Sequence, residues 1–255
     1  MRKKAQISIF VIIAIVIVAA ILVVLYFPKI KQVFSSSSPD IRIKECFQTD
    51  LEDVVKTISE QGGSFSPENY YLYKGEKLEY LCYTNQNFKT CSMQVPLLKQ
   101  KIEKEILENI RNKIDSCIDS AKQDLVGKGY TIEEGSRQIS LNILPNKIAV
   151  KISGISFQKQ DTGAIYNNFN YDFSSQLYNL VMITSSILNF ETVYGDSEIS
   201  TYMIYYPDIK VEKLKQEDGS KVYILTPNSG DRFVFATRSL SWPGGYASSI
   251  YTPQR

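Results

Sequence analysis

The sequence predicts an α+β fold in which one N-terminal transmembrane helix precedes an extracytoplasmic domain of helices and antiparallel sheets. A long apolar segment near the N-terminus predicts the membrane helix. Elsewhere, apolar residues recur at helical spacing in some segments and alternate with polar residues in others, a mixture typical of α+β proteins. The predicted parts of the domain at 40–238 are a helix at 40–62, a tyrosine-rich hairpin at 70–84, a long helix at 97–126, strands within 137–173, a helix at 174–190 and a C-terminal meander at 208–238.

The apolar segment covers residues 7–27 and contains no charged residue. As a helix it would be about 31 Å long, which matches a hydrocarbon core of about 30 Å. Tyr26 lies where an interfacial aromatic residue is expected, and Pro28 ends the helix. The alternative, a cleaved secretory signal, needs a shorter apolar core and small residues at its exit, where Leu25 and Phe27 flank Tyr26. We therefore interpret the segment as a retained membrane anchor.

The segments on either side of the anchor indicate its orientation. Three basic residues lie in the leader at 1–6, and two follow the apolar segment. Because positive charge is enriched on the cytoplasmic side, the N-terminus is expected to be cytoplasmic and the C-terminal domain extracytoplasmic, at the cell membrane. A tether at 28–39 contains four consecutive serines, and polar linkers of this kind are flexible.

Charge and composition exclude several classes of function. The chain of 255 residues has 29 basic and 27 acidic residues, but five of the basic residues precede Gln32, which leaves 24 basic against 27 acidic and a net charge of −3 for the rest. A mildly acidic domain gains no counterion-release affinity, so nucleic acid is not an expected partner. The chain also lacks histidine, the commonest general base and metal ligand.

Helical segments follow the tether. Asp40 is placed to cap the first helix, and Gly62 with Gly63 ends it. The long helix has an apolar stripe and a charged opposite face that we interpret as solvated. The residues of that stripe are Leu98, Ile102, Ile106, Ile110, Ile114, Cys117, Ala121 and Leu125. Ser174 is expected to cap the later helix, and a short helix at 199–206 is expected to stop at Pro207.

Three groups of strands are expected. Two runs flank Gly75 in the tyrosine-rich hairpin. Two further strands meet at a turn formed by Pro145 and Asn146 and are followed by a third strand near residue 171. The meander at 208–238 has turns at 218–219 and 229–230, and the tail at 239–255, rich in Ser, Gly and Pro, is expected to be loose.

The four cysteines, Cys46, Cys82, Cys91 and Cys117, all follow the anchor. Their even number favours two disulfides formed in an oxidising compartment, with buried free thiols as the alternative. A zinc site would need all four thiolates at irregular spacing. Cys46 and Cys117 lie on the apolar stripes of two helices, so their pairing is favoured, and Cys82 and Cys91 can close a small loop.

No motif indicates catalysis, and no cofactor site is evident. The chain has no nucleophile elbow, phosphate-binding loop or dinucleotide fingerprint. Ser156 and Lys159 have the spacing of a Ser-x-x-Lys pair, but their segment is predicted to be a strand, in which the two side chains point to opposite faces. The paired acids at 133–134 and 217–218 adjoin glycines and are expected to be solvated, although two distant carboxylates acting as a glycosidase pair remain open.

Tyrosine is the one compositional excess, with 17 Tyr and 12 Phe against one Trp. Tyrosine suits contact surfaces because it buries a large area at low entropic cost and keeps a polar tip. The alternative is that these tyrosines simply populate strands, which they favour. The candidate interaction face consists of Tyr70, Tyr71, Tyr73, Tyr80 and Tyr83.

The N-terminal sequence resembles a known family. Lys3-Lys4-Ala5-Gln6-Ile7-Ser8-Ile9-Phe10, followed by the apolar run, is similar to the class III signal peptide of archaeal type IV pilin-like proteins. The resemblance implies cleavage by a prepilin peptidase between Ala5 and Gln6, with the apolar helix retained. It covers about the first 27 residues, and Phe10 stands where pilins usually have a Glu that pairs with a neighbouring N-terminus.

A second resemblance covers the start of the domain. Cys46, the helix end at Gln61-Gly62-Gly63 and Cys117 are similar to uncharacterised membrane-anchored proteins of small-genome archaea, which carry no known activity.

These observations predict a membrane-anchored cell-surface protein with a binding or structural role and no enzymatic activity. The alternatives are a pilin-like subunit of a surface filament or secretion apparatus, and an extracytoplasmic hydrolase. Expected partners are the lipid bilayer and another surface protein or further copies of the chain. Phe10, Pro28 and the serine tether favour an anchor over a polymerisation stem.

Overall fold

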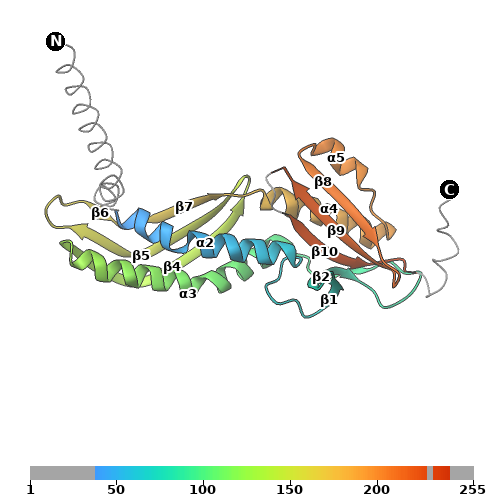
Figure 1. The fold of residues 1–255 in the computed structure, drawn as a ribbon, viewed down its shortest axis with the longest axis horizontal. Coiled ribbons are helices and arrows are strands. Elements are labelled where there is room, and N and C mark those ends of the chain that lie inside the picture. Colours follow the sequence, from blue (N-terminus) through green and yellow to red (C-terminus); the bar gives the residue numbers. More distant parts are fainter. Residues whose placement is uncertain (1–37, 229–231, 242–255) are drawn as a thin grey trace, which may run out of the picture. The chain divides into compact units, whose positions relative to one another are not determined.

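The computed structural model describes residues 38–228 and 232–241 (Figure 1). The chain divides into two compact units, Met1–Arg42 and Ile43–Arg255. The predicted leader, anchor and most of the tether, with the cleavage site between Ala5 and Gln6, lie outside the described residues. No helix within the described ranges is long and apolar enough to cross a membrane.

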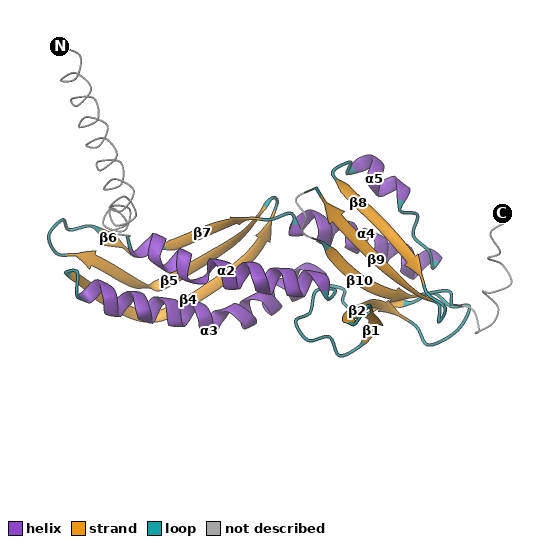
Figure 2. Ribbon diagram, in the orientation of Figure 1, coloured by secondary structure: helices purple, strands orange, loops and turns teal. Residues whose placement is uncertain are grey.

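The second unit has an α+β fold with two sheets, as the sequence predicts (Figure 2). Two helices, α2 (Pro39–Glu60) and α3 (Leu98–Val126), run along one face of the first sheet. All eight residues of the predicted α3 stripe are buried, because a period of about 3.6 residues keeps them on the side that faces the sheet. The backbone N–H of Gly63 donates to Ile58 O at 2.8 Å, which ends α2 where the two glycines predict.

The first sheet is antiparallel. It contains β4 (Tyr130–Leu144), β5 (Lys147–Lys159), β6 (Ile165–Tyr166) and β7 (Phe169–Ser174), with both β6 and β7 paired to β5. Asn146, at φ 62°, lies in the predicted turn between β4 and β5. Both strands are longer than the alternating core that predicts them, because their outer halves pair beyond a β-bulge between Glu134 and Gln138.

The second sheet has the order β1-β2-β10-β9-β8, with β3 paired to β2. Its strands are β1 (Tyr70–Tyr73), β2 (Glu76–Tyr83), β3 (Ser92–Met93), β8 (Ile209–Lys215), β9 (Ser220–Pro227) and β10 (Phe233–Arg238). β8, β9 and β10 form the expected antiparallel meander, but β10 pairs with β2 in parallel. The prediction of purely antiparallel sheets is therefore wrong at this junction, where strands distant in sequence meet.

Two helices cover one face of the second sheet. α4 (Leu177–Tyr194) begins later than expected: Ser174 ends β7, and the hydroxyl of Ser175 instead accepts a hydrogen bond from Leu177 N at 3.2 Å. The short helix α5 (Ser200–Tyr205) forms as expected before Pro207. Buried side chains of both sheets and of α2, α3 and α4 belong to one continuous hydrophobic core.

The start of the C-terminal tail is packed and not loose. Ser239 and Ser241 are buried, and Leu240 N donates to Lys89 O at 2.8 Å. The predicted loose tail is therefore wrong for residues 239–241, where backbone hydrogen bonds to the loop after β2 fix the chain. Residues 242–255 and the predicted turn at 229–230 lie outside the described residues.

Candidate functional site

The cysteines form two disulfides that hold the elements around them. Cys46 on α2 is joined to Cys117 on α3, and Cys82 on β2 is joined to Cys91, which precedes β3. These are the pairings that the sequence favours. The first bond links the two helices of the four-stranded sheet, and the second closes the loop that the C-terminal residues contact.

The tyrosine-rich hairpin does not form one exposed face. Tyr70 is 39% exposed, whereas Tyr80 is only 7% exposed and its hydroxyl lies 2.7 Å from Ser220 Oγ. Burial raises the pKa of Tyr80 to about 12, with a smaller contribution from the charge of Asp218. The predicted interaction face is therefore wrong for Tyr80, because this residue helps fill a core between the hairpin and the sheet.

The remaining hairpin tyrosines also pack. Tyr71, Tyr73 and Tyr83 are partly buried against the small core around Tyr80. Tyr71 reaches across to the turn between β8 and β9, where its hydroxyl donates to Gln216 Oε1 at 3.2 Å. Of the five tyrosines, only Tyr70 is exposed. The packing of the hairpin against the neighbouring strands thus explains most of its tyrosines.

A buried ionic cluster links α4 to the sheet below it. Glu191 is fully buried, and its carboxylate accepts hydrogen bonds from Lys221 Nζ at 2.8 and 3.1 Å and from the Tyr223 hydroxyl. Lys221 also donates to Gly195 O. Burial and the adjacent Glu191 carboxylate raise the pKa of Tyr223 well above its ordinary value. Because the carboxylate and the ammonium are saturated by protein partners, the cluster fits a structural role.

Asp196 adds an acidic group at the edge of this cluster. It accepts a hydrogen bond from Lys213 Nζ at 2.8 Å and lies 3.4 Å from Lys221 Nζ. Burial alone would raise its pKa, but the Lys213 hydrogen bond and the charges of Lys221 and Lys215 together lower the pKa to about 2. Asp196 therefore stays ionised at neutral pH and holds lysines of two strands, β8 and β9, near the end of α4.

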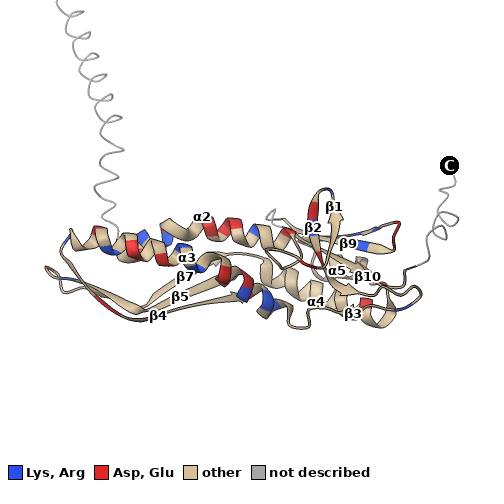
Figure 3. Cartoon of the chain, turned by 90° about the horizontal axis from the view of Figure 1, so that it is seen from below, with Lys and Arg blue, Asp and Glu red and all other residues tan. Residues whose placement is uncertain are grey.

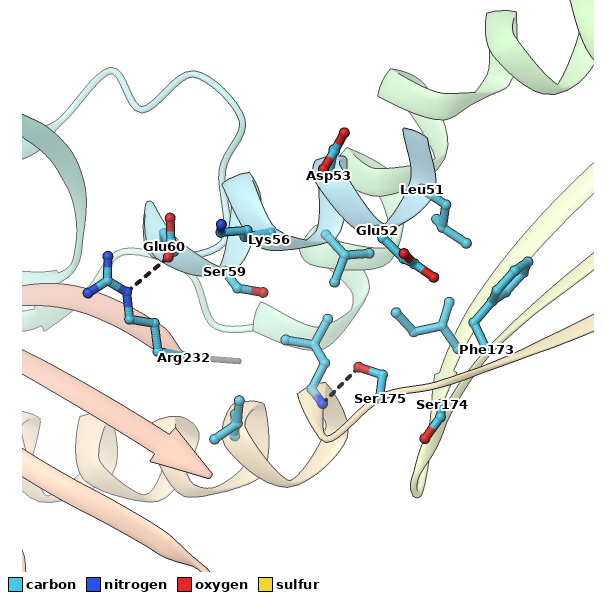
Figure 4. Close-up of a pocket in the computed structure, with 14 residues that line it drawn as sticks. Leu51, Glu52, Asp53, Lys56, Ser59, Glu60, Phe173, Ser174, Ser175 and Arg232 are labelled. Carbon is cyan, nitrogen blue, oxygen red and sulfur yellow. Dashed lines mark hydrogen bonds and ion pairs between the residues drawn. The ribbon is translucent and has the colours of Figure 1, made fainter. Parts of the chain in front are cut away.

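One hollow lies between α2, the start of α4 and the four-stranded sheet. Its volume is about 300 Å³, with an apolar floor and a rim of charged and hydroxyl side chains. Figure 4 shows Glu60 turned toward Arg232, whose Nε donates to Glu60 Oε1 at 2.9 Å. The floor is formed by Leu51, Val55, Ile148, Phe173, Leu177 and Leu180.

The acidic side chains of this hollow do not form a pair of carboxylates on opposite walls. Its three acids, Glu52, Asp53 and Glu60, all come from α2, and Glu60 is paired with Arg232. A glycosidase needs two carboxylates on opposite sides of the bond that it cleaves. Hydrolase activity therefore stays a prediction without a matching site here. Among residues 38–228 and 232–241, no group of three or more Asp, Glu and Cys residues could hold a metal ion.

The other candidate motifs are occupied by structural contacts. Ser156 and Lys159 both lie in β5. Glu134 is bound by Lys122 and Arg137, and these hydrogen bonds, that of Lys122 first, lower the pKa of its carboxyl group. The carboxylate of Asp218 accepts hydrogen bonds from Ser220, which stabilises the turn before β9.

The helices α4 and α5 form an uncharged surface. Glu191 is the only charged residue within the two helices, and it is buried, so their outer faces carry no charge. Figure 3 shows these helices almost entirely tan, whereas α2 and α3 carry acidic and basic residues along their length. The hydroxyls of Ser186 and Tyr202 lie 2.9 Å apart and join α4 to α5.

Large apolar side chains project from this surface, which we name the α4–α5 surface. Ile204 and Tyr205 are each 76% exposed, and Tyr194 is 66% exposed. The aromatic rings of Phe190 and Tyr194 are 5.7 Å apart. The exposed large apolar residues of the surface are Met182, Phe190, Val193, Tyr194, Met203, Ile204, Tyr205 and Tyr206. Groups of exposed apolar side chains are common at interaction sites of soluble domains.

Comparisons with protein-family models, curated proteins and solved structures return no match. The α4–α5 surface and the Glu191 cluster are also features that the sequence reasoning missed. A scarcity of charge between residues 174 and 206 is the one sequence signal of the surface. Periodicity alone does not separate the inner stripe of α4 from its outer face, because both are apolar.

Proposed function

We propose that this chain is a membrane-anchored, extracytoplasmic protein that acts by binding another protein through the α4–α5 surface. The observation that carries the proposal is the composition of that surface: aromatic residues and methionine with no charge, as in the cores of protein interfaces. The two disulfides support a location in an oxidising compartment outside the cytoplasm. The apolar segment at 7–27 supports the anchor.

The binding role is tested by photocrosslinking in cells that make the full chain. A benzoylphenylalanine placed at Tyr205 should give a discrete crosslinked protein band. The same residue placed at Glu108, on the charged face of α3 with a side chain 60% exposed, should give none. Equal labelling at both positions, or no band from Tyr205, contradicts a binding role for the surface.

The anchor is tested separately. Ile12→Lys places a charge within the apolar segment, at a cost of up to about 3 kcal/mol, and should release the protein from the membrane fraction. The matched variant Glu108→Lys should remain with the membranes. A chain that still sediments after Ile12→Lys is not held by this segment.

The location is tested through the cysteines. In the denatured but unreduced protein a maleimide reagent should label no cysteine, and after reduction it should label all four, because each is in a disulfide. Four reactive thiols before reduction would place the domain in a reducing compartment.

A second candidate, a pilin-like subunit, is favoured by the residues around Ala5 and Gln6. N-terminal sequencing of the mature protein separates the two. Gln6 as the first residue, together with surface filaments that are lost on deletion of the chain, would favour the pilin-like subunit. An unprocessed N-terminus would favour an ordinary signal anchor.

A further inference from the structure

We propose that the partner of the α4–α5 surface is the same surface on a second copy of this chain, in a two-fold symmetric dimer. The inference rests on the proposed function and names the partner of that site. Its three arguments concern the pattern of α4, the charge of the surface and the exposed area.

The outer face of α4 has the pattern of a helix that packs on both sides. Met182, Ser186, Asn189 and Val193 are spaced by four, three and four residues, and this spacing is typical of a seam between two helices. The inner face of α4 is already buried against the sheet. A helix whose outer face carries apolar residues and no charge is often covered by a further element. Within the described residues α5 contacts this face at Ser186, whereas Met182, Asn189 and Val193 stay exposed, so the pattern calls for a further protein surface over these residues.

The charge distribution points to a second copy as that protein. The proteins best matched to an uncharged apolar surface are those with an uncharged apolar surface of their own. Elsewhere on the described chain the helices alternate acidic and basic residues (Figure 3). The α4–α5 surface is therefore its own best match among the described surfaces. Asp196, Glu198, Asp208 and Lys210 are the charged residues that flank it in sequence.

The exposed area is what a stable dimer needs. Together, the exposed fractions of the eight large apolar residues equal the full surface of more than four side chains. At about 200 Å² for each side chain, this gives an upper bound of roughly 900 Å² on each copy, because the four consecutive residues at 203–206 do not all point the same way. A standard protein interface buries about 800 Å² on each partner.

A two-fold axis near Asn189 fits the polar groups of the seam. The amide of Asn189 is both a donor and an acceptor, so two copies of it can hydrogen-bond to each other across the axis. Ser185 and Ser186 are small enough to let two α4 helices approach closely. Their hydroxyls are already satisfied within one chain, by Val181 O at 2.8 Å and by the Tyr202 hydroxyl at 2.9 Å, so they can be buried without a new partner.

The dimer is tested with the full chain in detergent by light scattering of the eluted protein. The eluted wild-type particle should contain two copies of the chain. Ile204→Glu and Tyr205→Glu each place two like charges in the interface, and the association constant should fall at least about 100-fold. Because both side chains are 76% exposed in a single chain, neither substitution should change the thermal midpoint of the monomer. Glu108→Lys should remain a dimer.

A crosslink checks the geometry. Asn189→Cys in membranes should give a disulfide-linked dimer on a non-reducing gel, whereas Glu108→Cys should not. A wild type with one copy at micromolar concentration, a dimer unaffected by both charge variants, or no Asn189→Cys crosslink overturns the dimer. If the Tyr205 photocrosslink then joins the chain to a different protein, the binding role stands and only the identity of the partner is wrong. If Tyr205 gives no adduct at all, the binding role also falls.

Discussion

The ammonium group of Lys221 lies 2.8 Å from Glu191 Oε2, and both side chains are buried beneath α4. This pair, completed by the hydroxyl of Tyr223, ties the end of α4 to β9, which lies between β8 and β10. It therefore fixes the helix that carries the α4–α5 surface.

Glu191→Gln should destabilise the protein by about 3–5 kcal/mol, because it leaves the charge of Lys221 buried without its partner. Urea denaturation followed by circular dichroism measures the change. The double variant Glu191→Leu with Lys221→Met should lose less stability than Glu191→Gln, since neither charge remains. A single variant as stable as the wild type would show that Lys221 finds another partner.

Replacing the cysteines of each disulfide by serine should lower the free energy of unfolding by unequal amounts. Cys46 and Cys117 are 71 residues apart, whereas Cys82 and Cys91 are 9 apart. Loop-closure entropy predicts losses of about 4 kcal/mol for the first pair of Ser substitutions and about 3 kcal/mol for the second. Denaturant midpoints of the two double variants measure this order, and the reverse order would contradict the entropic account. Peptide mapping without reduction should find both pairs and no others.

Asp196→Asn should reduce stability near neutral pH and matter less in acid. The folded-state pKa of Asp196, about 2, is below its ordinary value of 3.8. Its contribution is therefore present above 3.8 and is lost as the pH falls through about 2. The shift corresponds to about 2 kcal/mol, and solvent screening of a side chain that is 42% exposed reduces this to no more than about 1 kcal/mol. Unfolding curves of both proteins from about pH 6 to about pH 2 should converge. A constant difference would assign the effect to packing.

Gly154→Ala should destabilise the four-stranded sheet far more than Gly163→Ala. Both glycines have positive φ, 84° and 66°, but a Cβ at Gly154 would lie 2.1 Å from Ser136 O, whereas a Cβ at Gly163 would meet nothing within 4 Å. Gly163→Ala should therefore cost about 1–2 kcal/mol from backbone strain alone. Gly154→Ala should cost about 3 kcal/mol or more, because the β-bulge opposite must move. Equal thermal midpoints would show that the bulge yields freely.

Local patterns predict most of the elements of this fold. The stripe of α3 is a single period repeated from Leu98 to Leu125, and Gly62 with Gly63 ends α2 because glycine accepts positive φ. Each of these signals is carried by residues close in sequence. The start of α4 and the order at residues 239–241 escape such reasoning, because their partners are distant in sequence. Ser175 N donates to Asn146 O, and Leu240 N donates to Lys89 O.

The candidate site is less accessible to sequence reasoning than the fold. The tyrosine-rich hairpin is conspicuous in composition, but only its pairing with a curled sheet decides that Tyr80 is buried and Tyr70 exposed. For the α4–α5 surface the opposite holds. In the sequence its residues resemble those of a hydrophobic core, and only the placement of α4 on the sheet leaves Phe190 and Val193 at the surface.

The sequence by itself determined the α+β class and the order and type of most elements, because helix period, strand alternation and turn glycines are local properties. It favoured the cysteine pairing that the structure contains and left free thiols as the alternative. Tertiary structure alone decided the parallel joining of β10 to β2, the burial of Glu191 with Lys221, and which apolar residues remain exposed. These features depend on which faces meet between segments that are 30 residues apart for Glu191 and Lys221 and 156 apart for Tyr80 and Ala236, and no local pattern specifies that.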